Sequence, residues 1–159
     1  MAVIRRFPLA SEAATAALAA ALAPRLKAGD ALLLDGPLGA GKTSFARALI
    51  RRLAGPGTEV PSPTFNLVLT YDIDGVTLWH FDLYRIDDPR ELDELGLDDA
   101  LAEGISLIEW PDRLGPETPA DALTLRLRPD PAGATARVAE FDGDAAWAAR
   151  LQGMEIRLG

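Results

Sequence analysis

The sequence predicts an α/β fold in which a mainly parallel sheet is flanked by helices and extended by added antiparallel strands. Apolar runs of strand length alternate along the chain with stretches of helical period. Residues 31–35 are apolar up to a terminal acid, as in a strand buried on both faces of a parallel sheet. Asp74-Gly75 separates two strand-like runs and indicates a β-hairpin, which adds antiparallel pairing.

The first half of the chain is expected to run strand, helix, strand, loop, helix. Residues 3–7 suit a short edge strand, and Ser11 suits the N-cap of a helix that ends before Pro24. The strand at 31–35 leads into a Gly-rich loop. Beyond that loop, apolar residues recur at helical spacing until Gly-Pro-Gly at 55–57 ends the helix.

The second half is expected to contain the hairpin, three further strands and three short helices. An extended Pro-containing loop precedes the hairpin, and acid-rich turns lead into short helices. The expected strands are 67–71, 76–84, 105–108, 123–127 and 137–141, and the expected helices are 87–95, 97–103 and 144–151.

Composition limits the possible partners. The 159 residues are expected to form a single domain, and the lack of cysteine excludes disulfides and thiolate metal sites. A net charge of −8 disfavours unaided binding to nucleic acid or to an anionic membrane. Arg5 and Arg6 precede an Ala-rich stretch that imitates a signal peptide. Glu12 and leucines at helical spacing favour instead a packed amphipathic helix, and hence a cytoplasmic protein.

The Gly-rich loop at 36–43 (Gly-Pro-Leu-Gly-Ala-Gly-Lys-Thr) matches the phosphate-binding loop pattern at every fixed position. Its glycines let the backbone curl so that N–H groups converge on phosphate oxygens at a helix N-terminus. Lys42 is expected to reach the β- and γ-phosphates, and the Thr43 hydroxyl to bind Mg²⁺. The strand, loop and helix together predict a P-loop NTPase-like sheet. The predicted nucleotide contacts in this segment are Gly36, Leu38, Gly39, Ala40, Gly41, Lys42, Thr43 and Ser44.

The loop alone does not distinguish an ATPase from a GTPase or a kinase. Guanine-specific GTPases usually read the base with an Asn-Lys-x-Asp stretch. The only asparagine here, Asn66, is followed by Leu67 and Val68. GTP is therefore disfavoured, and the predicted cofactors are ATP and Mg²⁺.

Two acids are candidates for binding Mg²⁺ or orienting the attacking water. Asp82 lies late in the 76–84 strand, and Glu109 directly follows the 105–108 strand. Because ligands of open parallel sheets collect at the carboxyl ends of strands, both side chains are expected near the γ-phosphate. Either acid can equally be a solvated strand terminus or a cap, so both interpretations stay open at this point.

Five nearby residues have plainer interpretations. Asp35 is interpreted as structural, and His80 as a packed, hydrogen-bonded histidine because nothing pairs with it in the sequence. Composition favours Trp110 as filler at the edge of the core. Thr64 resembles a switch threonine that caps Mg²⁺. Arg85 is either a solvated charge or a group that neutralises phosphate.

Four ordered segments together resemble the TsaE family, the bacterial ATPase of tRNA threonylcarbamoyladenosine synthesis. Residues 38–43 resemble its loop, and 62–65 (Ser-Pro-Thr-Phe) its switch segment. Residues 80–85 (His-Phe-Asp-Leu-Tyr-Arg) resemble its strand motif, and 108–111 (Ile-Glu-Trp-Pro) its acidic-aromatic motif. The resemblance spans about 7–137, and the last two segments are the ones specific to the family.

The resemblance implies a P-loop ATPase that acts with two partner proteins, TsaB and TsaD. Hydrolysis of Mg-ATP would support turnover of this transferase complex, and tRNA would be reached only indirectly through the partners. By family similarity Thr43 and Glu109 approach Mg²⁺, and Asp82 fills the strand-acid role. Thr64 then belongs to the switch, and Trp110 is functional rather than filler. The catalytic set implied in this way is Lys42, Thr64, Asp82, Glu109 and Trp110.

The resemblance also points to contacts outside the loop. Family members contact adenine and ribose near the start of the first helix, which corresponds to Ser11 or Glu12. They also use an arginine in a late turn, for which Arg137 is the candidate here.

Two other functions stay open at the level of sequence. A small-molecule kinase would require an acceptor pocket and usually an arginine-bearing lid, and the sequence beyond the helix after the loop supplies no compact arginine cluster. A scaffold in which ATP only props open a binding surface would leave its bound ATP intact.

Overall fold

The computed structural model describes residues 2–61 and 67–157. Its strands are β1 (Ala2–Leu9), β2 (Ala31–Asp35), β3 (Val68–Ile73), β4 (Val76–Asp82), β5 (Ile105–Glu109), β6 (Leu123–Pro129) and β7 (Arg137–Gly143). Its helices are α1 (Glu12–Leu22), α2 (Lys42–Ala54), α3 (Glu91–Glu94), α4 (Leu97–Glu103) and α5 (Ala145–Arg150), with 3-10 helices η1 (Ala23–Arg25) and η2 (Pro111–Glu117).

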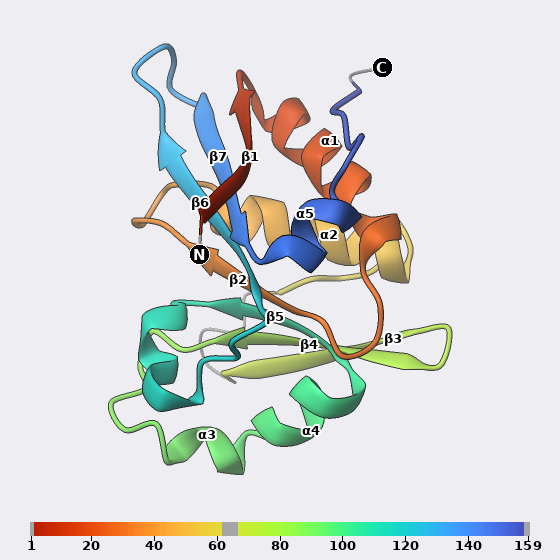
Figure 1. Ribbon diagram of the computed structural model, residues 1–159, viewed down its shortest axis with the longest axis vertical. Helices are drawn as coiled ribbons and strands as arrows, with labels where there is room; N and C mark the ends of the chain where they lie inside the picture. The colour runs from red at the N-terminus through yellow and green to blue at the C-terminus, as the bar shows by residue number, and fades with distance from the viewer. Residues whose placement is uncertain (1, 62–66, 158–159) are drawn as a thin grey trace.

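These strands form one sheet in the order β1-β7-β6-β2-β5-β4-β3 (Figure 1). The four central strands, β6, β2, β5 and β4, are parallel to their neighbours within this group. Antiparallel strands extend the sheet on both sides, with β3 beside β4 and with β7 and β1 beyond β6. The predicted α/β class, with a parallel centre and added antiparallel strands, is confirmed.

Helices cover the sheet on two sides, with α1, α2 and α5 on one face and α3 and α4 on the other (Figure 1). The central strand β2 is buried between these layers. Leu32 and Leu34 pack into the core beneath α1 and α2, whereas Ala31 and Leu33 pack into the core beneath α3 and α4. This double burial explains the unbroken apolar run, because a strand covered on both faces has no solvated side.

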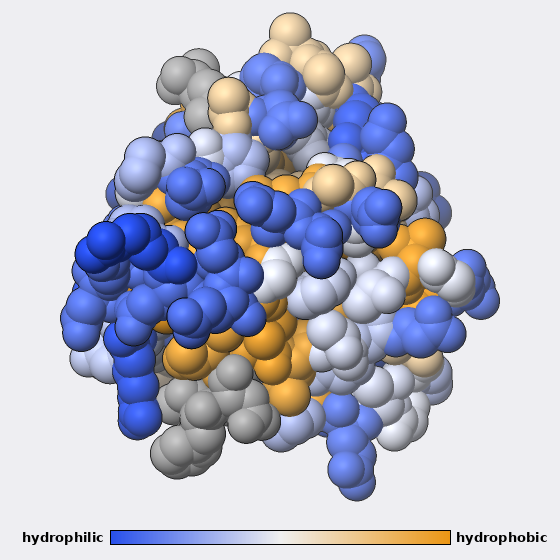
Figure 2. Space-filling model, turned by 90° about the horizontal axis from the view of Figure 1, so that it is seen from below, coloured by the Kyte–Doolittle hydropathy of each residue, from blue (hydrophilic) through white to orange (hydrophobic). Residues whose placement is uncertain are grey.

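The face carrying α3 and α4 is acidic and mixed in hydropathy. Figure 2 shows this side, where hydrophilic side chains surround apolar patches. The exposed acids of the two helices are Glu91, Asp93, Glu94, Asp98, Asp99 and Glu103.

Most predicted elements form near their expected limits, but two are shorter. The strand expected to reach residue 84 ends at Asp82, because the Asp82 carboxylate accepts a hydrogen bond from the Tyr84 amide and turns the chain. The helix expected from residue 87 begins only at Glu91. The Glu91 carboxylate accepts hydrogen bonds from the amides of Asp87 and Asp88 and holds those residues in a turn. The 3-10 helix η2 was not predicted.

Among the described residues, no helix is both long enough and apolar enough to cross a bilayer.

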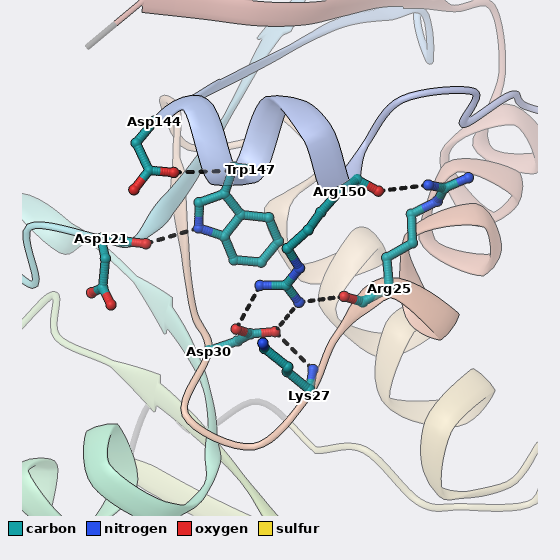
Figure 3. A network of polar contacts seen from close by, with 7 residues as sticks. All are labelled: Arg25, Lys27, Asp30, Asp121, Asp144, Trp147 and Arg150. Carbon is teal, nitrogen blue, oxygen red and sulfur yellow. Dashed lines mark hydrogen bonds and ion pairs between the residues drawn. The ribbon is translucent and has the colours of Figure 1, made fainter.

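A polar network centred on Arg150 fastens the last helix to the segment before β2 (Figure 3). The Arg150 guanidinium donates to both carboxylate oxygens of Asp30, at 2.9 and 2.5 Å, and to the carbonyl of Arg25. Arg25 returns a 2.6 Å hydrogen bond to the Arg150 carbonyl. The guanidinium lies 3.9 Å from the ring of Trp147, whose indole N–H donates to the Asp121 carbonyl. The network therefore ties α5 to the segment directly before the central strand.

Replacing Arg150 with Met is expected to lower the free energy of unfolding by about 2–4 kcal/mol, because it leaves the buried Asp30 carboxylate without its ionic partner. Denaturant unfolding measures the change. Arg90→Ala is the control, because the Arg90–Asp88 ion pair is exposed and contributes little to stability. Equal unfolding midpoints for the two variants would contradict this account of the network.

Candidate functional site

The Gly-rich loop lies between the end of β2 and the start of α2. Gly36, Gly39 and Gly41 have φ values of 153°, 79° and 95°, a region that side chains with a Cβ rarely adopt. Gly41 is the N-cap of α2 and offers no side chain to cap it. The first N–H groups of the helix are thus left for an anion, as a phosphate-binding loop requires.

Lys42 is buried in this loop, with 5% of its surface exposed. Its ammonium donates a 2.6 Å hydrogen bond to the Gly36 carbonyl and lies 3.7 Å from the centre of the Trp110 ring. Burial lowers the pKa of Lys42 below its ordinary 10.5, although nearby carboxylates, Glu109 foremost, oppose the shift. Because the buried ammonium has lost part of its hydration, an anionic ligand that pairs with it would be stabilised here.

Asp82 and Glu109 lie opposite each other at the carboxyl ends of β4 and β5. Glu109 in turn pairs with Leu34 on β2, directly before the loop. Both acids are largely buried, with 9% and 3% of their surfaces exposed. Neither is a solvated strand terminus, and both line a cavity together with residues of the loop.

The loop and the two acids line one cavity of about 380 Å³. Contributions from distant segments complete its walls. The lining residues are Glu12, Leu38, Gly39, Gly41, Lys42, Thr43, Ser44, Asp82, Glu109, Trp110 and Arg137. The cavity therefore brings together most of the residues predicted from sequence.

Three predicted contacts are not among the residues that line the cavity. The Gly36 carbonyl binds Lys42, Ala40 is fully buried in the loop, and the Ser11 hydroxyl accepts from the Ala14 amide as the N-cap of α1. Of the two candidates at that helix start, Glu12 is the one that reaches the cavity. Thr64 lies outside the described residues.

Arg137 joins the first residue of β7 to the loop. Its guanidinium donates 2.9 Å hydrogen bonds to the carbonyls of Gly39 and Ala136. Its Nε is buried and has no hydrogen-bond partner among the described residues. The arginine therefore lies against the loop at the cavity, with one donor unused in the described part of the chain.

Trp110 combines the two interpretations given for it. Its side chain packs against the core beneath α3 and α4, and its ring also faces the cavity over the Lys42 ammonium. The Tyr84 ring lies 4.9 Å away. Trp110 has φ 60° and ψ 55°, a left-handed conformation that is uncommon for a bulky residue and that clusters at functional sites. Core filling alone does not account for it.

His80 has a partner that sequence reasoning missed. Its Nε2 lies 2.7 Å from Oε2 of Glu109, and both side chains are buried. The histidine is packed and hydrogen-bonded as predicted, and its partner comes from a distant segment that the sequence did not indicate. The pair is 29 residues apart in sequence. The available signal was that His80 and Asp82 share a strand face beside the strand that ends in Glu109.

Asp35 does not line the cavity, and Arg85 lies beside it. The Asp35 carboxylate is exposed, 3.7 Å from the Arg126 guanidinium. Arg85 lines a smaller adjoining cavity of about 210 Å³ with Leu38, Asp82, Tyr84 and Trp110.

The oxygen donors fit the chemistry of a magnesium site shared with phosphate. Thr43, Asp82 and Glu109 line the same cavity and offer a hydroxyl and two carboxylates, which are the hard donors that Mg²⁺ prefers. The described residues contain no group of three or more His, Cys, Asp or Glu that could hold a metal without further ligands. This donor set suits an ion that keeps waters and substrate phosphates among its ligands.

The parallel strands, the loop after β2 and the buried loop lysine define a protein with the P-loop NTPase fold. The chain belongs to the TsaE family: the model of threonylcarbamoyl adenosine biosynthesis protein TsaE matches residues 9–137.

Individual relatives agree with this family. The tRNA threonylcarbamoyladenosine biosynthesis protein TsaE of Rickettsia conorii is 49% identical over 102 residues, covering 64% of this chain and 58% of that protein. The match thus spans less than two thirds of that relative. The Bacillus subtilis protein of the same name is 36% identical, covering 72% of this chain and 71% of its own length. The crystal structure of YdiB from Bacillus subtilis superimposes with a TM-score of 0.75 at 27% identity, covering 92% of this chain and 90% of YdiB.

Replacing Gly36 with Ala is expected to distort the loop, because the new Cβ would lie 2.3 Å from the Leu127 carbonyl oxygen. ATP binding should weaken at least tenfold, and the thermal midpoint should fall. Gly39→Ala is the control: its Cβ meets nothing within 4 Å, so only backbone strain of about 1–2 kcal/mol is added. Calorimetry of ATP binding and thermal unfolding measure both, and equal losses of stability would contradict the steric argument.

Replacing Lys42 with Met is expected to change the pH dependence of stability. The lowered pKa means that the folded chain releases this proton before the unfolded chain does. The wild type should therefore gain free energy of unfolding relative to Lys42→Met as pH rises through the window between that lowered pKa and 10.5. Denaturant unfolding across the alkaline range measures the difference, and a constant difference would show that the ammonium is not desolvated.

Proposed function

We propose that this protein is an ATPase of tRNA threonylcarbamoyladenosine biosynthesis that binds and hydrolyses Mg-ATP. The observation that carries the proposal is the convergence of the loop, Lys42, Asp82 and Glu109 on one cavity. A binding-only site would need the loop and the lysine. Two buried acids at the phosphate end of that cavity serve hydrolysis.

The residues divide the work between binding and chemistry. The loop amides and Lys42 hold the phosphates, and Lys42 also offsets charge on the transferred phosphoryl group. Thr43 and one acid hold Mg²⁺, which when bound neutralises charge on the phosphate oxygens. The other acid orients the attacking water. Since phosphoryl transfer depends on positioning and charge stabilisation, small displacements of these groups reduce the rate strongly.

Glu12 and Arg137 lie at the cavity wall away from the acids' strands and are proposed to contact the nucleoside part of ATP. Glu12 comes from the start of α1 and Arg137 from the start of β7. The Arg137 Nε, buried and without a partner among the described residues, is a donor that a ligand oxygen can use.

The proposed partners are TsaB and TsaD, with tRNA reached only through them. The acidic surface argues against direct contact with tRNA, because a net charge of −8 repels a phosphate backbone. Partner docking is proposed to raise hydrolysis by ordering the catalytic groups around bound ATP. The cytoplasm, where tRNA is modified, is the compartment this function implies.

Replacing Glu109 with Gln is expected to lower kcat for ATP hydrolysis about 100-fold while changing the ATP dissociation constant less than about threefold. The neutral amide keeps the shape of the side chain but cannot act as a carboxylate. Glu117→Gln makes the same change at an exposed position in η2 and should leave kcat unchanged. Phosphate release measured with TsaB and TsaD present tests this. Equal rates in both variants would remove Glu109 from the chemistry.

Formation of threonylcarbamoyladenosine over many turnovers tests the assignment to the pathway. The assay contains purified TsaB, TsaD, tRNA and supplied threonylcarbamoyl-adenylate, with and without this protein and ATP. The modified nucleoside should accumulate beyond the first turnover only when both are present. Equal accumulation without the protein would refute the pathway role while leaving ATP binding intact.

A further inference from the structure

The buried His80–Glu109 pair is a feature that the roles proposed so far do not use. His80 lies on β4 and Glu109 at the end of the neighbouring parallel strand β5. His80 is opposite Leu107, and Asp82 is opposite Glu109, so the four side chains share one face of the sheet. His80 therefore lies one step deeper in the protein than the two acids of the cavity.

The contact between the two side chains is short and dry. Nε2 of His80 lies 2.7 Å from Oε2 of Glu109, and the side chains are only 1% and 4% exposed. An ionised carboxylate can only accept, so Nε2 is the donor. No other hydrogen bond to the Glu109 carboxylate is found in residues 2–61 and 67–157. One oxygen is thus bound on the protein side, and the other is left to the cavity that Glu109 lines.

The hydrogen bond to Glu109 is the one polar contact found for the His80 ring among the described residues. The residues next to it on the same face, Leu78 and Leu107, belong to the apolar core beneath α2. Its other ring nitrogen, Nδ1, finds no hydrogen-bond partner in the part of the chain that is described. Burying a polar ring among leucines costs free energy, and the single hydrogen bond to Glu109 offsets only part of it. The effect of that bond on Glu109 would explain why a histidine lies here.

Glu109 needs such a restraint. A glutamate has three rotatable side-chain bonds, and restricting them costs up to about 2 kcal/mol of entropy. A carboxylate that must hold a metal or aim a water works only in a narrow range of orientations. A hydrogen bond from behind the site selects that orientation before ATP arrives.

We infer that His80 is a positioning residue that orients the Glu109 carboxylate toward the nucleotide cavity. It touches neither ATP nor Mg²⁺ and acts on the rate only through Glu109. The inference rests on the proposed function, since it assumes that Glu109 acts on the bound nucleotide.

The first test compares two replacements of similar size in the full chain. His80→Gln keeps an N–H donor near the position of Nε2, whereas His80→Leu fills the space without a donor. His80→Leu should lower kcat for ATP hydrolysis about 10–100-fold with the ATP dissociation constant within about threefold, and His80→Gln should recover most of the rate. Circular dichroism and thermal midpoints establish that both variants fold.

The second test places His80→Leu in the Glu109→Gln background. If His80 acts through Glu109, its replacement should lower kcat further by less than about twofold there, because the group it orients is already gone. A merely structural histidine would lower the rate by the same factor in both backgrounds. That result, or an unchanged kcat for His80→Leu in the wild-type background, would overturn the inference.

A third measurement is independent of catalysis. The chain contains a single histidine, so the imidazole ¹H–¹⁵N spectrum of the untagged, nucleotide-free protein reports on His80 alone. A slowly exchanging Nε2–H signal is expected in the wild type and should shift or disappear in Glu109→Ala. An identical signal in both proteins would overturn the contact. A wild type that hydrolyses no ATP even with TsaB and TsaD would refute the proposed function and the inference built on it, whereas an active wild type with unaffected His80 variants would refute the inference alone.

Discussion

The burial of β2 on both faces is the constraint on which the site depends. Leu32 and Leu34 face one core and Ala31 and Leu33 the other, so a slip of one residue would exchange the two sets. The resulting register pairs Leu34 with Glu109 on β5. The loop that follows β2 therefore emerges beside Glu109, and the next strand brings Asp82 to the same level. Close contact between Gly36 and the Leu127 backbone on β6 holds the start of the loop from the other side.

The electrostatics of the site follow from bringing a cation and two acids into this buried corner. Lys42 loses hydration, which lowers its pKa, and the acids restore part of its stability by attraction. Each of the two buried acids has a hydrogen-bond donor: Asp82 accepts from the Tyr84 amide and Glu109 from His80. The charges of Lys42, Asp82 and Glu109 therefore lie together at the cavity, where a phosphate would pair with the cation and Mg²⁺ with the acids.

Local sequence patterns predicted the individual segments of this site better than the contacts between them. The loop at 36–43, the strand before it and the acids at two strand ends were predictable, because each depends on a short segment and on the general geometry of parallel sheets. The His80–Glu109 contact and the link from Arg137 to Gly39 were not. They depend on which strands become neighbours, which long-range packing decides. Trp110 shows the same limit: composition suggested core filling and the family resemblance a functional role, but neither predicted its left-handed backbone or the Lys42 ammonium over its ring.

The fold was predictable for similar reasons and to a similar extent. Most strands and helices follow from hydrophobic period and turn residues. The pairing of β1 with β7 brings the first strand beside the last one, and the ion pair between Arg150 and Asp30 joins residues that are 120 positions apart in sequence. Neither has a local signature. The early end of β4 and the late start of α3 arise because side-chain carboxylates accept hydrogen bonds from nearby backbone amides. Such bonds compete with regular secondary structure, and residue propensities do not predict which of the two forms.

Hydrolysis of ATP bound in this cavity can be followed in a single-turnover experiment. The protein, in excess over γ-labelled ATP and with TsaB and TsaD present, is mixed with Mg²⁺ or with a chelator, and the fate of the label is followed. The label should appear as free phosphate only with Mg²⁺. Label that stays in bound ATP, or that moves to an acceptor, would contradict it and indicate a scaffold or a kinase.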